Sequence, residues 1–129
     1  MSGIIPSPQV HFIGEIKGAT GFEQNRLFCK WSFKTGVHWT LISGNETGET
    51  YEEETDDNDP NFFWDHPFDL HYKVNSVRGW PRIVVEVWEV SDEGRYSLAG
   101  YGIGTVPCKP GEHKILIECW RPTSKSWLG

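Results

Sequence analysis

The 129-residue sequence has little that would build a helix, a membrane span or a metal-stapled domain. No stretch of helical length carries apolar residues at the 3.6-residue spacing of an amphipathic helix. No apolar run approaches the roughly 20 residues that a membrane helix needs. The N-terminus, "MSGIIPSPQV", lacks the basic region of a signal peptide. The expectation is therefore one domain over residues 1–129, without a membrane anchor.

Cysteine is also scarce. Cys29, Cys108 and Cys119 are an odd number and are far apart in sequence. This usage predicts reduced thiols in a cytoplasmic protein, and it lacks the C-x-x-C spacing of a zinc site.

Basic residues are missing between Lys34 and Lys73, where acidic residues concentrate. The acidic residues of this stretch are Glu46, Glu49, Glu52, Glu53, Glu54, Asp56, Asp57, Asp59, Asp65 and Asp69. We interpret residues 46–60 as an acidic mobile loop, which is either a solvated loop or a docking surface for a basic partner. The net charge of −6 argues against binding to nucleic acid or to anionic membranes by the whole surface.

From Lys109 onward the balance becomes basic, so the two ends of the module could carry opposite charge. Such asymmetry suits the orientation of a partner domain, because complementary charge steers encounter. The residues predicted to bind partners are Glu52, Glu53, Glu54, Asp56 and Asp57 in the acidic block, and Lys109, Lys114 and Arg121 in the basic tail.

What the sequence does contain is alternation with a period of two, which is typical of β-strands. The segments expected as strands are 10–18, 26–33, 37–42, 68–74, 82–90, 98–106 and 113–120. Segment 82–90 is apolar on nearly both faces and is expected to be a central strand with core residues Ile83, Val85 and Val87. Turn residues separate these segments, and the pattern predicts an all-β antiparallel β-sandwich.

The stretch "WDHPFDLHY" (64–72) raises the question of a metal or catalytic site. Pro67 is expected just before the strand, with Phe68, Leu70 and Tyr72 facing the core and Asp69 with His71 facing outward. A metal site needs a third convergent ligand, and the sequence spacing brings none to this place. We interpret the pair as a structural His–Asp pair, with a metal site as the alternative.

Signatures of catalysis are equally scarce. There is no G-x-S-x-G motif, and no cysteine has a histidine beside it. The glycine-rich "GYGIG" (100–104) is not followed by a helix, so it does not predict a phosphate loop. The sequence favours a protein that is not an enzyme and has no cofactor; a carbohydrate-binding or hydrolytic sandwich is a remote alternative.

Segment 85–107 resembles the strand–loop–strand of C2 domains, which are β-sandwiches that often dock on membranes through calcium. The positions that match the Asp-x-Asp pair of that family are Glu89 and Ser91, and the next Asp is replaced by Tyr96 or Ser97. Calcium takes six to eight oxygens, mostly from carboxylates. We therefore expect no functional calcium site, although the sandwich is implied.

Five stretches together resemble the B9-domain family, a ciliary branch of the C2-like folds, over about residues 14–122. They are "LFCKWSF" (27–33), "HPFDLHY" (66–72), "GWPRIVVEVW" (79–88), "LAGYGIGTVPCKPGEHK" (98–114) and "CWRP" (119–122). The resemblance implies a non-enzymatic assembly role at the ciliary base, at the basal body or transition zone. The implied partners are other B9-domain proteins and tectonic-like members of the Meckel-syndrome complex, which helps assemble the cilium and gate its membrane.

Two further expectations follow from this resemblance. The alternative function is that of a peripheral phospholipid-binding domain with weak contact to a membrane at the ciliary base. Relatives also carry a segment after "CWRP" that supplies a last strand, so the final strand of the family is expected to be missing from this chain, which would leave a sheet edge unpaired.

Overall fold

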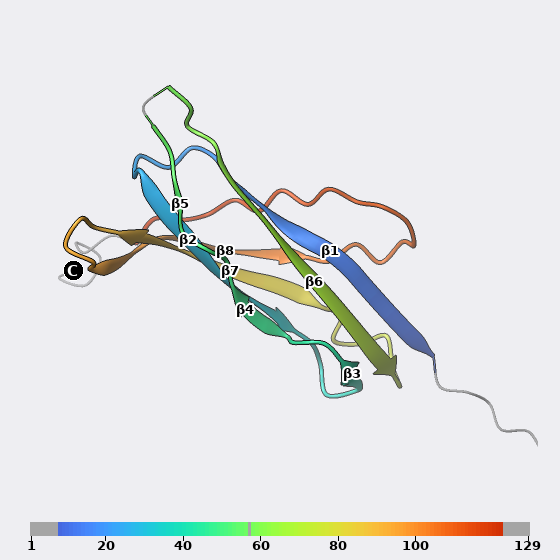
Figure 1. Ribbon diagram of the computed structural model, residues 1–129. Helices are drawn as coiled ribbons and strands as arrows, with labels where there is room; N and C mark the ends of the chain where they lie inside the picture. The colour runs from blue at the N-terminus through green and yellow to red at the C-terminus, as the bar shows by residue number, and fades with distance from the viewer. Residues whose placement is uncertain (1–7, 57, 123–129) are drawn as a thin grey trace, which may run out of the picture.

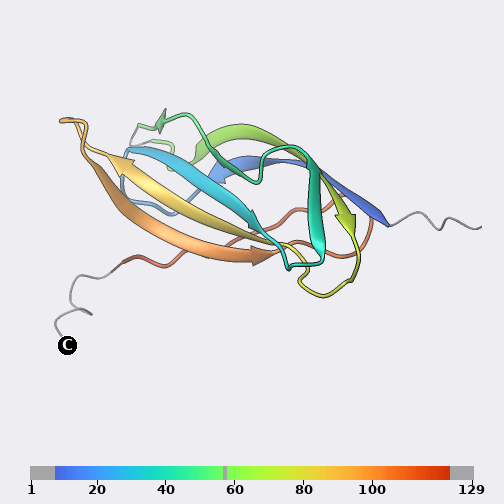
Figure 2. The same cartoon turned by 90° about the horizontal axis from the view of Figure 1, so that it is seen from below.

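Two antiparallel sheets form a sandwich in the computed structural model, which describes residues 8–56 and 58–122 (Figures 1 and 2). Sheet A has the order β1-β6-β3, and sheet B has the order β4-β2-β7-β8 with β5 also paired to β2. The strands are β1 (Gln9–Ala19), β2 (Arg26–Lys34), β3 (Trp39–Ser43), β4 (Thr47–Glu49), β5 (Glu53–Glu54), β6 (Phe62–Val74), β7 (Arg82–Val90) and β8 (Tyr96–Thr105). No helix of the described residues is long and apolar enough to cross a membrane.

The period-two pattern of the sequence decides which side chains enter the space between the sheets. Leu27, Cys29, Trp31 and Phe33 of β2 are buried, while Lys30 between them is exposed. Ile83, Val85 and Val87 of β7 are buried, as predicted. From β6, Leu70 and Tyr72 are buried and Asp69 faces outward. The all-β antiparallel sandwich is thus confirmed, and β7 lies between β2 and β8 as expected of a central strand.

Aromatic rings fill one end of the sandwich and connect the two sheets. The ring of Phe12 on β1 lies 5.9 Å from Phe33, 6.4 Å from Trp39, 6.1 Å from Tyr72 and 6.3 Å from Trp80, measured between centroids. Such edge-to-face, tilted and stacked contacts add about 0.5–1.5 kcal/mol per pair beyond the burial of apolar area. This aromatic cluster fixes the spacing of the sheets where the β2–β3 and β6–β7 loops meet.

Pro67 departs from the prediction, because it lies inside β6 rather than before it. It is the register partner of Glu15 on β1. A proline lacks the N–H that a ladder needs, so it is tolerated only where one side of its strand has no neighbour. β3 pairs with β6 only over His71–Val74, so the opposite side of β6 is unpaired at Pro67. The strand therefore continues through a residue that sequence rules would place at its start.

The prediction of a strand at 113–120 is wrong, because the backbone of this segment does not form a ladder. The predicted alternation of inward and outward side chains is present at its end. The segment forms one isolated bridge, Tyr101 to Trp120, instead of a ladder. The segment runs back antiparallel to β8 and lies against the glycines of that strand (Figure 1). Ile117 and Cys119 pack on the core, and Leu116 is 84% exposed. Its backbone approaches the inner face of β8 too closely to continue the sheet as a neighbouring strand.

Glycine is required in β8 by this close approach. A Cβ atom built on Gly102 would lie 2.6 Å from the carbonyl oxygen of Glu118 and 2.8 Å from Cγ2 of Ile117. The "GYGIG" motif is therefore a packing surface for the 115–120 segment. Its function in the fold is to let an extended segment close the side of the sandwich.

The interpretation of residues 46–60 as one loop is also corrected in part. Thr47–Glu49 and Glu53–Glu54 form the short strands β4 and β5, both paired to β2. Between them Thr50 is buried; its backbone N–H donates to the carbonyl of Cys29, and its hydroxyl accepts from the Cys29 N–H. The two short strands cover the edge of β2, which protects it from pairing with another chain.

We predict that Gly102→Ala destabilises the protein by about 1–3 kcal/mol, because the new methyl group overpacks the contact with Glu118 and Ile117. Urea unfolding measures the change. The control is Thr105→Ala, on the same strand and exposed, which should stay within about 0.5 kcal/mol of the parent. Equal stability of the Gly102→Ala protein and its parent would show that the segment does not press on β8.

Candidate protein-binding surfaces

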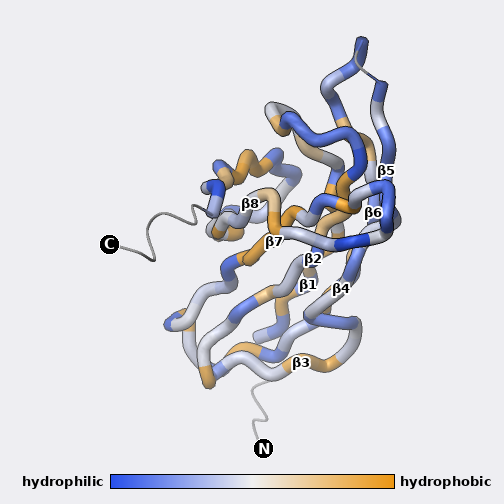
Figure 3. Tube along the Cα trace, turned by 90° about the vertical axis from the view of Figure 1, so that its left-hand side faces the viewer, coloured by the Kyte–Doolittle hydropathy of each residue, from blue (hydrophilic) through white to orange (hydrophobic). Residues whose placement is uncertain are grey.

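The two ends of the sandwich carry opposite charge. One end, here called the acidic end, is made by the β1–β2, β5–β6 and β7–β8 connections; β5 and the hydrophilic segment around it lie at this end (Figure 3). The opposite end, here called the basic end, is made by the β2–β3 and β6–β7 loops and the segment after β8. Basic residues there are Lys34, Lys73, Arg78, Arg82, Lys109 and Lys114, with Glu112 in the segment after β8 and Glu46, whose carbonyl accepts from the Phe33 N–H, as acidic neighbours.

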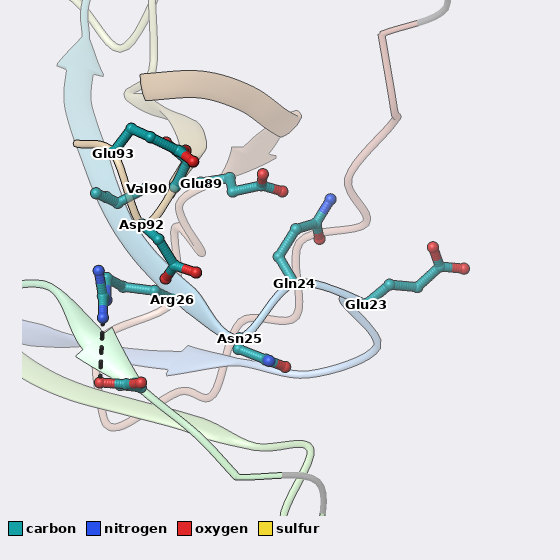
Figure 4. Close-up of a pocket in the computed structure, with 10 residues that line it drawn as sticks. Glu23, Gln24, Asn25, Arg26, Glu89, Val90, Asp92 and Glu93 are labelled. Carbon is teal, nitrogen blue, oxygen red and sulfur yellow. Dashed lines mark hydrogen bonds and ion pairs between the residues drawn. The ribbon is translucent and has the colours of Figure 1, made fainter. Parts of the chain in front are cut away.

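A cleft of about 360 Å³ opens at the acidic end (Figure 4). Its charged lining residues are Glu23, Arg26, Glu54, Glu89, Asp92 and Glu93. Arg26 Nη2 lies 3.5 Å from Oε2 of Glu54, so one of these carboxylates has a cationic partner. Glu89, Asp92 and Glu93 come from the end of β7 and the turn after it. The cleft thus has an excess of carboxylates and suits a cationic group of a partner.

The predicted acidic residues lie at this end, although not in one loop. Glu53 and Glu54 belong to β5, and Glu52 directly precedes it. Asp56 uses its side chain to accept hydrogen bonds from the backbone N–H groups of Asn58 and Asp59, at 2.9 and 3.1 Å. Asp57 lies outside the described residues. The acidic block is therefore a set of exposed carboxylates on a turn and a short strand.

The predicted basic tail does not stay together. Lys109 and Lys114 follow β8 at the basic end, where the Lys109 carbonyl lies 2.7 Å from Nε2 of His113. Arg121 instead reaches the acidic end, where its Nη1 lies 3.5 Å from Oε1 of Glu23. The reason is the return of the 113–120 segment along β8, which carries the chain back to the opposite end. Arg121 thus lowers the negative charge of the acidic end and does not extend the basic surface.

The basic end holds a second cleft, of about 270 Å³, which is called the basic cleft below. It is lined by Lys34, Thr35, Gly36, Gly79, Trp80 and Arg82, and it contains no acidic residue. Lys34 and Arg82 are direct register partners on β2 and β7. Like charges placed opposite each other on neighbouring strands are destabilising. This cleft was not found from the sequence, because its residues lie on two segments about 45 positions apart.

The stretch "WDHPFDLHY" contributes a polar cluster on the outer face of sheet A. The β1–β6 register places His11 opposite His71, and their rings stack at 5.1 Å. His11 forms a hydrogen bond with Asp69, and His71 Nε2 lies 2.8 Å from Oε1 of Gln9. The sequence spacing did not reveal that His11 belongs to this cluster. Asp69 forms its hydrogen bond with His11, not with His71. Among the described residues, no group of three or more His, Cys, Asp or Glu could hold a metal ion.

Aromatic and aliphatic side chains on β8 and after it make an exposed surface that the sequence did not predict. Tyr101 and Ile103 alternate with the inward-facing glycines of β8, and Trp120 is the bridge partner of Tyr101. Trp120 is 58% exposed, and its ring lies 5.6 Å from that of Tyr101. Tyr96 is 61% exposed and meets the ring of Phe28 at 5.3 Å. These four residues, Tyr96, Tyr101, Ile103 and Trp120, are called the β8 stripe below.

Comparison with known proteins decides the family. Residues 10–129 match the family model B9-C2, described as "Ciliary basal body-associated, B9 protein". The chain belongs to the B9-domain family. This confirms the resemblance that the five sequence stretches indicated, and with it the ciliary character of the family.

Relatives of this B9-domain chain include two types of B9 protein. B9 domain-containing protein 2 of Homo sapiens is 44% identical over 119 residues, covering 92% of this chain and 67% of that protein. The Drosophila melanogaster protein of the same name is 36% identical over 113 residues, covering 88% of this chain and 63% of that protein. B9 domain-containing protein 1 of Mus musculus is 32% identical over 126 residues, covering 95% of this chain and 62% of that protein. No solved structure matches the chain.

The ionisable groups of the B9-domain core are held in their neutral forms. Burial raises the pKa of the Cys29 thiol to about 12, with a smaller contribution from Cys119. Burial also raises the pKa of Cys119. For Tyr72, burial and the hydrogen bond that its hydroxyl donates to Glu46 raise the pKa of the phenol. A thiol is nucleophilic only as the thiolate, so Cys29 and Cys119 are poor nucleophiles at neutral pH.

We predict that the three thiols react in a fixed order with a maleimide reagent at about pH 8, near the ordinary thiol pKa of about 8.5. Cys108 is exposed and free and should react first, Cys119 is half-buried and should react slowly, and Cys29 should react only on unfolding. Mass spectrometry of the labelled protein over time measures the order, and denatured protein labelled at all three sites is the control. Early labelling of Cys29 would show that the inner face of β2 opens readily.

Proposed function

We propose that this chain is a non-enzymatic assembly module at the base of the cilium, where it binds other B9-domain proteins. In this role it contributes to the Meckel-syndrome, tectonic-like complex of the transition zone, which serves cilium assembly and the gating of ciliary membrane proteins. The basal-body description of the family supports the location. The similarity to two types of B9 protein supports a setting in which related domains coexist and can pair.

The observation that carries the proposal is the β8 stripe. Tyr, Trp and other large apolar side chains are enriched in the centres of protein interfaces, and a contiguous exposed group of them on a rigid element marks a binding surface. Tyr101 and Ile103 are held on a strand that is paired to β7 and packed on its inner face, so little backbone freedom remains to be lost on binding. A binding role of the sheet surface therefore needs no pocket.

The environment of the nucleophile candidates supports the absence of catalysis. Cys29 is buried with a raised pKa, and the His11–Asp69 pair lies on an open sheet face instead of in a cleft. Catalytic groups are normally preorganised by supporting contacts in a water-excluding site.

We predict that the double substitution Tyr101→Ala/Ile103→Ala weakens binding to separately purified B9 domain-containing protein 1 at least tenfold, which corresponds to about 1.4 kcal/mol. Titration calorimetry of the purified domains measures the affinity. The matched control is Ile13→Ala/Phe63→Ala, which removes exposed apolar side chains from the outer face of sheet A and should leave binding unchanged.

Three results have different meanings in this experiment. Absence of binding by the parent protein would contradict the proposed function. Equal affinity of the Tyr101→Ala/Ile103→Ala protein would move the interface away from the β8 stripe. Loss of binding in the control alone would place the interface on sheet A.

A specific observation also favours the second candidate, peripheral phospholipid contact. Val37 in the β2–β3 loop is 93% exposed, and Val77 in the β6–β7 loop is 77% exposed. Both apolar tips lie at the basic end, and basic side chains near a membrane surface gain about 1 kcal/mol each from anionic lipids. Apolar loop tips beside basic residues are what a weak membrane contact needs.

For this candidate we predict that the parent protein floats with vesicles containing phosphatidylserine and that Val37→Asp/Val77→Asp abolishes flotation. Neutral vesicles are the control for the electrostatic part, and Ile13→Asp on the outer face of sheet A is the control for a general effect of added charge. Parent protein that stays at the bottom of the gradient with both kinds of vesicle would reject the lipid candidate.

A further inference from the structure

The basic cleft holds two cations without a carboxylate to balance them. Of the ion pairs found among residues 8–56 and 58–122, none includes Lys34 or Arg82. The two side chains are direct register partners, so their repulsion is a cost to the fold that a bound anion would remove. The positive charges of the cleft therefore have no counter-charge within the part of the chain that the structure describes.

Backbone and indole contacts keep this cleft in place. The N–H of Gly36 donates to the carbonyl of Gly79 at 2.9 Å, and a Cβ built on Gly79, which has a φ of 74°, would lie 2.4 Å from Cα of Gly36. The Nε1 group of Trp80 donates to the carbonyl of Val106 at 2.7 Å. The two loops are therefore fastened to each other and to the end of β8, which makes the cleft a preformed receptor.

The opposite end of the same strand carries a matching acidic projection. β7 begins in the basic cleft at Arg82 and ends at Val90, directly before the turn Ser91–Gly94. The turn is closed by a hydrogen bond from the Gly94 N–H to the Ser91 carbonyl at 2.9 Å, and it carries Asp92 and Glu93, which are exposed and also line one side of the acidic-end cleft. Figure 2 shows this hairpin projecting from the end of the sheet. The exposed Arg95 stands behind the tip, where its backbone closes the hairpin on Ser91.

We infer that the basic cleft of one chain receives the Asp92–Glu93 tip of a second copy, so that B9 domains of this type associate head to tail. Because cleft and tip lie at the two ends of β7, the contact joins two different surfaces, and each copy in it keeps either a free tip or a free cleft for a further copy. A head-to-tail contact of this kind does not close on itself and gives open chains. The inference goes beyond the proposed binding of sister proteins, because the partner is the same chain.

The charges decide how this association responds to salt. Complementary clusters raise the rate of encounter and set the orientation more than they add affinity. The Debye length is about 30 Å at about 10 mM salt and about 3 Å at about 1 M. We therefore expect the average mass in sedimentation to rise with protein concentration at low salt, and to stay at the monomer value at high salt.

Two neutralising variants test the contact and its direction. The cleft variant is Lys34→Ala/Arg82→Ala, and the tip variant is Asp92→Asn/Glu93→Gln. Each should be monomeric alone, because each lacks one half of the contact. An equimolar mixture should form a dimer and nothing larger, since the intact tip of the cleft variant fits the intact cleft of the tip variant and no further contact can follow.

A matched control removes the same number of positive charges elsewhere. Lys17→Ala/Lys30→Ala takes them from the outer faces of sheets A and B, outside the basic end, and should associate like the parent protein. Circular dichroism and the unfolding midpoint establish that each variant is folded; a cleft variant that does not fold is replaced by Lys34→Gln/Arg82→Gln.

Four results would overturn the inference: a parent protein that is monomeric at low salt and high concentration; a cleft variant that associates like the parent; a mixture that stays monomeric; or a mixture that exceeds a dimer. A cleft variant that keeps self-association and loses binding to phosphatidylserine vesicles would assign the cleft to lipid. None of these results depends on binding to B9 domain-containing protein 1, so the inference and the proposed function can fail separately.

Discussion

The aromatic cluster around Phe12 is the packing constraint on which the basic end depends. Trp39 and Trp80 meet edge to face at 5.1 Å within this cluster, and their indole N–H groups point away to the backbone. Trp39 donates to the carbonyl of Arg78 at 3.0 Å, and Trp80 donates to that of Val106. Buried aromatic rings thereby anchor the loops that carry the exposed charges. A surface that must be preformed for recognition is built directly on this aromatic cluster.

The side of the sandwich at β8 is closed by a different kind of contact. The 115–120 segment gains few backbone hydrogen bonds, and it is held by the burial of Ile117 and Cys119 against an inner face of β8 that has no side chains at Gly100, Gly102 and Gly104. The glycines thus have two consequences. They admit the segment on the inner side, and they leave the outward-facing Tyr101 and Ile103 as the residues by which this stretch of β8 meets solvent or a partner.

Much of the fold could be predicted from alternation alone, because a half-buried strand imposes it directly. The boundaries of β7 and the inward residues of β2 follow from the apolar pattern. The positions that failed are those where a neighbour, not the local sequence, decides the outcome. Pro67 is accepted because β3 is too short to reach it, and 113–120 alternates like a strand without finding a ladder. No local pattern contains either fact.

The candidate surfaces were less predictable for the same reason. Opposite charge at the two ends was expected from the acidic block and the basic tail, and Lys109 agrees with it. Arg121 does not, because the returning segment carries it to Glu23. The clefts, and the meeting of His11 with Asp69, depend on strand register and on which loops share an end, and both are properties of the folded sandwich.

Charged and apolar groups lie on different parts of this surface, and they can contribute differently to binding: charge to orientation, apolar contact to affinity. Charge gathers at the ends, on turns and short strands, where it is exposed and acts over a Debye length. The exposed apolar residues of β8 lie on a strand whose backbone the ladder to β7 holds in place before any partner arrives. Long-range charge can orient an approaching domain but contributes little affinity when it stays solvated, whereas the burial of aromatic side chains contributes affinity only at contact. A module that bound through charge alone would release its partners at moderate salt. Joining oriented ends to a rigid apolar strand permits an encounter that is fast and a complex that persists, which is what the proposed role as an assembly module requires.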